Sequence, residues 1–291
     1  MGALVLLLAV ITFAPPQAGP AEQQTGASRV ALATVTDPKN RPLVDVSADD
    51  FVIQEAGAAR DVLSVRPADY PIVVLLDTGG DARADFPLLQ KAAAHFIDRI
   101  GQRPIALGTF GGTPKMLTTF EDERKTVLAR LADTAADTSA GSLLLQGAAL
   151  AGQTIHQTGT LFSAIVILSA TAVDASRNPA DEMIAQVVDS NAILHIVGRG
   201  TAPDFRGRVA NDNRDPNTSR TLRALAEQSR GEFTVIYSAS SYQAALDRLA
   251  DRLSAEMLIE YLVPVGSKPA EVKVGVRLLG AKVRGLGVAP R

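Results

Sequence analysis

The chain has 291 residues, which is enough for one large domain, or for a large and a small one, around a sizeable core. Its 29 basic and 31 acidic residues give a formal net charge of -2 at pH 7, which argues against nucleic acid or an anionic membrane as the partner. The absence of cysteine excludes disulfides, thiol catalysis and thiolate metal ligands.

An apolar stretch lies near the N-terminus, at residues 3–14, and a tract rich in Pro, Gly and Gln follows it. The stretch is short for a bilayer span but has the length of the hydrophobic region of a signal peptide. We expect residues 1–21 to be a signal peptide or a short hydrophobic anchor, and residues 22–28 to be a flexible lead. The protein is then exported to the periplasm or the cell exterior, and its mature chain does not insert into a membrane.

Strands are predicted on either side of a central region. Residues 29–36 alternate in polarity, and residues 51–65 have the pattern of a hairpin that is broken at Gly57. Further strands are predicted within residues 257–291. Neither these C-terminal strands nor the N-terminal β segment, residues 29–68, can be stable alone, so we predict that they meet in one small β-layer.

Strand and helix patterns alternate in the central region, residues 69–256. The strands are short apolar runs, typical of a parallel sheet that is covered on both faces, and the helices show apolar residues three and four positions apart. We predict an α/β, Rossmann-like domain with a mostly parallel sheet of six strands and helices on both faces. The strands are expected near residues 71–77, 104–110, 115–120, 163–169, 192–198 and 232–236.

The first of these strands ends in Asp77, and Gly79 and Gly80 follow. In parallel α/β sheets, ligands bind beyond the carboxyl ends of the strands, so Asp77 lies where this fold places chemistry. The two glycines have the spacing of neither common nucleotide-binding motif and give little support for a phosphate-binding turn.

The sequence Asp77-Thr78-Gly79-Gly80-Asp81 resembles the start of the metal-ion-dependent adhesion site in the von Willebrand factor A (VWA) family, especially in its secreted bacterial VWFA-related members. Four further segments are similar to family segments in the same order: VTDPKNRPLVDVSADDFVIQEAG, AGSLLLQGAALA, IVILSATA and TLRALAEQSRGEF. The resemblance covers residues 29–291 and implies a VWA fold with a protein-binding or adhesive role.

The metal site of the family uses the pattern Asp-x-Ser-x-Ser, with a Thr and a second Asp from two later loops. Asp77 matches the first Asp, but Gly79 and Asp81 stand at the two serine positions. Ser142 stands at the Thr position, and Ala170 stands at the position of the last Asp. Because a hard divalent ion needs several oxygen ligands, the resemblance implies a degenerate site without a specific metal or another cofactor. A weak Mg²⁺ or Mn²⁺ site on Asp77, Asp81 and Ser142 is the alternative.

The resemblance therefore implies a non-enzymatic, exported module that binds a protein partner. Its contact face is expected at the carboxyl end of the sheet, and the mixed-charge loop at residues 199–216 is expected to flank it. A metal-dependent adhesion module is one alternative. The residues assigned to the contact face are Asp77, Gly79, Asp81, Ser142 and Thr171.

A second alternative is an α/β enzyme that acts on a small or phosphorylated substrate, with Asp77 and Asp81 as general acid and base. In the simpler, structural interpretation, Asp77 accepts backbone N–H groups of the turn and Asp81 begins the next helix. The three histidines, His95, His156 and His195, lie on different elements and lack the spacing of metal ligands. His195 is interpreted as a core histidine bonded to a backbone group.

Overall fold

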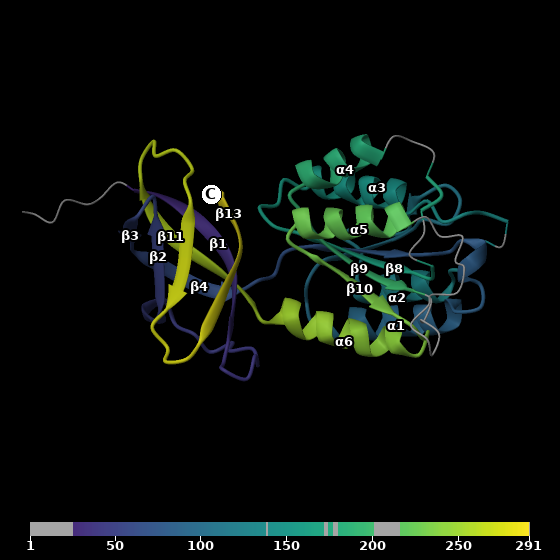
Figure 1. Cartoon of the computed structure of the whole chain (residues 1–291), viewed down its shortest axis with the longest axis horizontal. Coiled ribbons are helices and arrows are strands. Elements are labelled where there is room, and N and C mark those ends of the chain that lie inside the picture. Colours follow the sequence, from purple (N-terminus) through teal and green to yellow (C-terminus); the bar gives the residue numbers. More distant parts are fainter. Residues whose placement is uncertain (1–25, 138, 172–173, 177–179, 201–215, 291) are drawn as a thin grey trace, which may run out of the picture.

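The structure, a computed structural model, describes residues 26–290 except 138, 172–173, 177–179 and 201–215. Two units lie next to each other along the long axis of the molecule, an α/β unit and a β-sandwich built from strands that precede and follow it in the chain (Figure 1). No helix in the described part of the chain is long and apolar enough to cross a bilayer.

The α/β unit contains a six-stranded sheet with the strand order β10-β9-β8-β5-β6-β7. Neighbouring strands are parallel, except that β7 is antiparallel to β6. This arrangement confirms the predicted, mostly parallel sheet. The strands are β5 (Ile72–Leu76), β6 (Ile105–Thr109), β7 (Lys115–Met116), β8 (Ala164–Ser169), β9 (Ile193–Arg199) and β10 (Glu232–Ile236).

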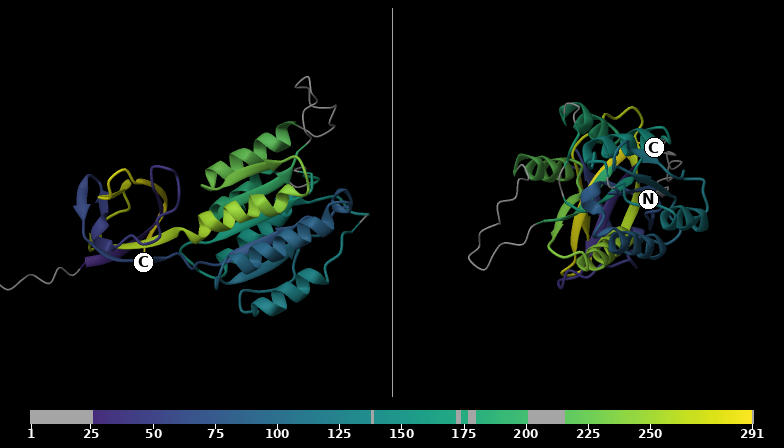
Figure 2. Two further views of the ribbon diagram at one scale, coloured as in Figure 1. Left: turned by 90° about the horizontal axis from the view of Figure 1, so that it is seen from below. Right: turned by 90° about the vertical axis from the view of Figure 1, so that its right-hand side faces the viewer.

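Helices cover both faces of this sheet, as predicted (Figure 2). Three of them, α1, α2 and α6, share a core with Ile72, Val74 and Leu76 of β5, whereas α3, α4 and α5 pack on Val73 and Leu75. This alternation is the two-residue period of a strand that is buried on both sides. The helices are α1 (Phe86–Arg99), α2 (Arg124–Ala132), α3 (Leu144–His156), α4 (Ala180–Asp189), α5 (Pro216–Gln228) and α6 (Ser241–Ser254).

The second unit is a β-sandwich of two sheets, with the strand orders β13-β1-β11-β4 and β12-β2-β3. β1 buries both of its faces, because Ala31 and Ala33 lie in the sandwich core whereas Val30 and Leu32 lie in the core of the α/β unit. The N- and C-terminal strands meet as predicted, but they form two facing sheets, since a single layer would leave the Ala31 face uncovered. The strands are β1 (Gly26–Thr36), β2 (Phe51–Glu55), β3 (Ala58–Arg60), β4 (Val62–Pro67), β11 (Glu256–Pro264), β12 (Val272–Val276) and β13 (Lys282–Pro290).

Pairing within the sandwich differs from the prediction in several details. β2 and β3 form the expected hairpin at Gly57, where φ is 78°, but β4 leaves this hairpin and pairs with β11. β12 pairs with β2, and the sequence does not predict β13, because Gly285 and Gly287 interrupt its apolar pattern. β1 begins at Gly26, within the lead expected at residues 22–28.

Polar contacts join the two units where α6 passes into β11. Tyr70 lies just before β5 and donates its hydroxyl hydrogen to the carboxylate of Glu256. The guanidinium of Arg103 lies 4.5 Å from the centroid of the Tyr70 ring and donates to the carbonyl of Leu253 at 2.5 Å. Glu256 is buried, and burial raises its pKa to about 7, although Tyr70 and Arg103 act in the opposite direction.

Glu256 should make the folded chain less stable as the pH rises. Its pKa is raised by folding, so its stabilising contribution is complete below the ordinary value of 4.5 and is lost as the pH passes the folded value of about 7. The loss is on the order of 3 kcal/mol. In urea unfolding between pH 4.5 and 8, Glu256→Gln should remove this component, whereas Glu271→Gln, at an exposed carboxylate, should keep the wild-type profile. The same profile in Glu256→Gln as in wild type would contradict this account.

Candidate functional site

Asp77 follows β5 at the carboxyl edge of the six-stranded sheet, and none of its surface is exposed (0%). β5 lies between β8 and β6, so the carboxyl ends of three parallel strands meet beside this residue. The backbone N–H of Asp77 donates to the carbonyl of Leu168 at 2.9 Å and so extends the pairing with β8. The sheet therefore places a carboxylate at the centre of its edge, as the sequence predicts.

Four hydrogen-bond donors converge on the carboxylate of Asp77. Oδ1 accepts the N–H of Gly79 at 3.0 Å and the hydroxyl of Ser142. Oδ2 accepts the N–H of Ala170 at 3.0 Å and the hydroxyl of Ser169 at 3.3 Å. A carboxylate has about four acceptor positions, so these donors match its full capacity.

The surroundings of Asp77 act on its pKa in two directions. Burial raises the pKa above its ordinary value, because the ionised form loses its hydration. The hydrogen bonds from Ser142, Gly79, Ala170 and Ser169 lower the pKa, but the net shift is upward. The ionised carboxylate is therefore stabilised by neutral N–H and O–H dipoles whose positive ends point toward its oxygens.

Gly79 provides the space in which Ser142 reaches the carboxylate. A Cβ at residue 79 would lie 2.4 Å from the hydroxyl oxygen of Ser142 and 3.0 Å from its backbone nitrogen, which is too close for a side chain. The φ of Gly79 is -65°, so the requirement is for space and not for an unusual backbone conformation. The family pattern has a serine here, and in this chain Ser142 occupies the volume that such a side chain would need.

Close backbone contacts join the loops around Asp77. The N–H of Gly80 donates to the carbonyl of Ala140 at 2.8 Å, and the hydroxyl of Thr78 accepts the N–H of Gly111 at 3.1 Å. A Cβ at Gly111 would lie 2.3 Å from the carbonyl carbon of Thr78, so the loops after β5 and β6 approach each other as closely as glycine allows. These contacts fix the edge of the sheet around the carboxylate.

Gly79 and Ser142, two residues assigned to the contact face, thus lie directly against Asp77. Thr171 is buried and follows Ala170 on the loop after β8. Ser142 bonds to Asp77 instead of capping α3, whose backbone N–H at Leu145 is met by the Asp174 carboxylate at 3.1 Å.

Asp81 is not brought to this cluster. It lies in a 3-10 turn, Gly80–Ala82, with an exposed side chain, and within the described ranges it shares no hydrogen bond with Asp77. It does not begin α1 either, since that helix starts at Phe86. Most of the loop that is predicted to flank the contact face, residues 201–215, lies outside the described residues.

An ion pair between Arg199 and Asp85 also lies at this edge, and no sequence pattern predicts it. Nε of Arg199 lies 2.6 Å from Oδ2 of Asp85 and 3.4 Å from the carbonyl oxygen of Ala170. Tyr242 of α6 donates its hydroxyl hydrogen to the carbonyl of Ser169 at 2.7 Å. Asp85 and Tyr242 belong to the starts of helices far apart in sequence, and only the folded sheet brings them together.

The oxygen atoms at this edge fit a divalent ion poorly. Where the family has its last Asp, Ala170 contributes an N–H whose positive end points at Asp77. The hydroxyl of Ser142 already donates to Asp77, and the side chain of Asp81 is exposed. Mg²⁺ requires about six oxygen ligands near 2.1 Å. No group of three or more His, Cys, Asp or Glu among the described residues is placed to hold a metal ion.

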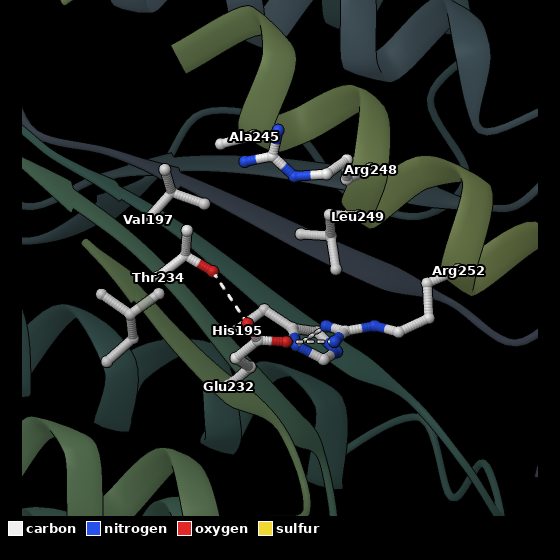
Figure 3. A pocket seen from close by; sticks show the side chains of 9 residues that line it. His195, Val197, Glu232, Thr234, Ala245, Arg248, Leu249 and Arg252 are labelled. Carbon is white, nitrogen blue, oxygen red and sulfur yellow. Dashed lines mark hydrogen bonds and ion pairs between the residues drawn. The ribbon is translucent and has the colours of Figure 1, made fainter. Parts of the chain in front are cut away.

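A second polar cluster surrounds His195, beneath α6 (Figure 3). His195 is buried as expected, but its partner is Arg252, whose Nη2 lies 2.9 Å from Nδ1, rather than a backbone group. Because a guanidinium only donates, Nδ1 accepts and Nε2 carries the proton. Burial lowers the pKa of His195 well below its ordinary value, and the charges of Arg252 and Arg284 lower it further, so the ring is neutral.

Adding a methyl group at residue 79 should destabilise the folded chain, because the new Cβ must displace the Ser142 hydroxyl from Asp77. We expect Gly79→Ala to lower the free energy of unfolding by about 1–3 kcal/mol, from overpacking and a lost bond to a buried carboxylate. Gly275→Ala is the matched control, because a Cβ there meets nothing closer than 3.8 Å. Its unfolding free energy in urea should change little. Equal losses in the two variants would refute the close-contact explanation.

Comparisons with known proteins identify the fold. No protein-family model matches the chain, and no curated protein matches it. The structure is similar to a von Willebrand factor type A protein from Catenulispora acidiphila, with a TM-score of 0.51 and 13% identity over 93% of this chain and 74% of that chain. It is also similar to proximal thread matrix protein 1 from the mussel byssus, with a TM-score of 0.51 and 11% identity over 65% of this chain and 48% of that chain. The chain therefore has the fold of a von Willebrand factor A domain, to which a β-sandwich is joined.

Proposed function

We propose that this protein is a non-enzymatic, exported VWA-like module that binds a protein partner without a metal ion. The observation that carries the proposal is the filled hydrogen-bonding capacity of Asp77, whose four donors occupy the positions through which the family's site holds a cation. The apolar stretch at residues 3–14 supports export, and the net charge of -2 supports a partner other than nucleic acid.

The proposed contact face is the carboxyl edge of the sheet, with Asp77, Gly79, Asp81, Ser142 and Thr171. Asp77 and Ser142 are buried and shape this face from beneath, whereas Asp81 is exposed and offers a negative charge to the partner. Recognition then depends on backbone groups, hydroxyls, shape and the charge of Asp81 rather than on a shared cation.

An acid and base pair at this edge has little support. Asp77 is enclosed by its four donors, and Asp81 lies apart from it in the exposed turn. A general base must lie within hydrogen-bond reach of the substrate proton that it takes. The enclosed carboxylate of Asp77 does not offer a substrate that access. The edge thus favours binding over proton transfer.

Calorimetric titration of Mg²⁺ or Mn²⁺ into the full chain tests the metal-free part of the proposal. We expect no saturable heat of binding, because Ala170 and Gly79 supply no side-chain oxygen ligands. For the same reason, we expect EDTA to leave the midpoint of thermal unfolding unchanged. Asp77→Asn, which keeps the size of the side chain, should give the same null titration. Saturable binding to wild type that disappears in Asp77→Asn would show that the site still holds a cation.

The contact face is tested by affinity capture with the full chain as bait. A partner held at this edge should be retained equally in Mg²⁺ and in EDTA, and Asp81→Arg should reduce its retention about tenfold, since the charge is reversed at the interface. Arg130→Gln, at an exposed residue of α2, is the control and should retain the partner like wild type. Retention by Asp81→Arg at the wild-type level would place the contact elsewhere.

A further inference from the structure

A strongly basic cleft lies between α6 and the sandwich, at the junction of the two units rather than at the Asp77 edge. Its volume is about 490 Å³, and α6, β1, the loop after β1 and β13 form its walls. Figure 1 shows that these elements come from distant parts of the chain and meet at the C-terminal end of α6. The cationic side chains of this basic cleft are Arg248, Arg252, Lys282 and Arg284.

Two carboxylates at the basic cleft already have partners. Asp251, which also lines the cleft, lies 2.5 Å from Arg99 of α1. Glu232 of β10 forms an ion pair with Arg252. Among the described residues, these pairs leave the other cations of the cleft without an ion-paired carboxylate, although the charge of Arg284 also acts on Glu232 and Glu256.

Three cations of the basic cleft stand outside the ion pairs of the described residues. Arg248, Lys282 and Arg284 are exposed, and within the described part of the chain their side chains make no hydrogen bond or ion pair. Three like charges around one hollow repel each other, and this repulsion is offset when an anion binds between them. Such a concentration of positive charge is notable in a chain whose net charge is -2.

The positive potential of the basic cleft extends to neighbouring groups. The pKa of Glu232 is lowered: burial opposes the shift, but the hydrogen bond and charge of Arg252 and the charge of Arg284 outweigh it. A second pocket, of about 270 Å³, shares Arg248 and Arg252 as walls and is lined by Thr234 of β10 (Figure 3). The two guanidinium groups thus stand between two adjoining hollows.

The remaining lining of the basic cleft suits an organic anion. Val35, Val283 and Ala255 form an apolar part of the wall, which lowers the local dielectric constant and strengthens charge interactions. Thr36 and Asn40 add polar groups that can donate hydrogen bonds. Guanidinium groups bind oxyanions through paired N–H donors, and the volume suits a small molecule better than a polymer.

We propose that the basic cleft binds a small organic oxyanion with two or more negative charges. Phosphate esters and polycarboxylates share this chemistry. The anion lies between Arg248 of α6 and Lys282 and Arg284 of β13, and Asn40 of the loop after β1 covers it. Binding therefore links the α/β unit to the sandwich.

Isothermal titration of pyrophosphate and of citrate into the full chain at low ionic strength tests this proposal. We expect saturable binding of at least one of them, and the double variant Arg248→Gln/Arg284→Gln should weaken it about tenfold or more, because two charge-assisted contacts are lost. Arg130→Gln is the matched control for loss of an exposed arginine and should bind like wild type. The exposed, unpartnered state of Arg248 and Arg284 means that the double variant should fold, which circular dichroism checks.

The results separate the possible ligands. Binding of pyrophosphate alone identifies a ligand that carries phosphate groups, binding of citrate alone identifies a polycarboxylate, and binding of both assigns the site to multivalent oxyanions in general. A rise in the midpoint of thermal unfolding with anion concentration should accompany binding and should vanish in the double variant. The proposal is overturned if neither probe binds, if the double variant binds like wild type, or if Arg130→Gln weakens binding to the same extent.

Discussion

The hydrogen-bonded carboxylate of Asp77 holds the carboxyl edge of the six-stranded sheet together. It joins the end of β5 to β8 through Ser169 and Ala170, and to the start of α3 through Ser142. Removing one donor would leave a buried charged group partly unsatisfied, at a cost of about 1–3 kcal/mol or more. Hydrogen-bond donors of the protein itself therefore gather these loops around the end of β5.

A second constraint joins the two units into one folded body. β1 has the sandwich core on one face and the core of the α/β unit on the other, and Leu258 and Leu286 of the neighbouring strands contribute to the latter core. The buried hydrogen bond from Tyr70 to Glu256 also joins the two units at this junction. The walls of the basic cleft belong to both units, so their spacing is set by this shared packing rather than by a flexible linker.

Much of the fold can be predicted from the sequence because local patterns determine it. The buried run at residues 72–76 and its terminal Asp77 place the strand, the edge and the carboxylate correctly. The identity of the donors is harder to predict, since Ala170 acts through a backbone N–H that every residue except proline possesses. The two-sheet sandwich likewise depends on pairing between strands that are far apart in the chain, for which the sequence of β1 offers two apolar faces but no register.

The directions of β1 and β5 determine how far the start of the described chain lies from the edge with Asp77. Gly26 pairs with Pro264, at the end of β11 that points away from α6, whereas β5 runs from the junction outward to Asp77. The first described residue and the edge with Asp77 therefore lie at opposite ends of the long axis (Figure 1). The packing of the sandwich on the α/β unit therefore keeps Gly26 and the edge with Asp77 far apart in the folded molecule.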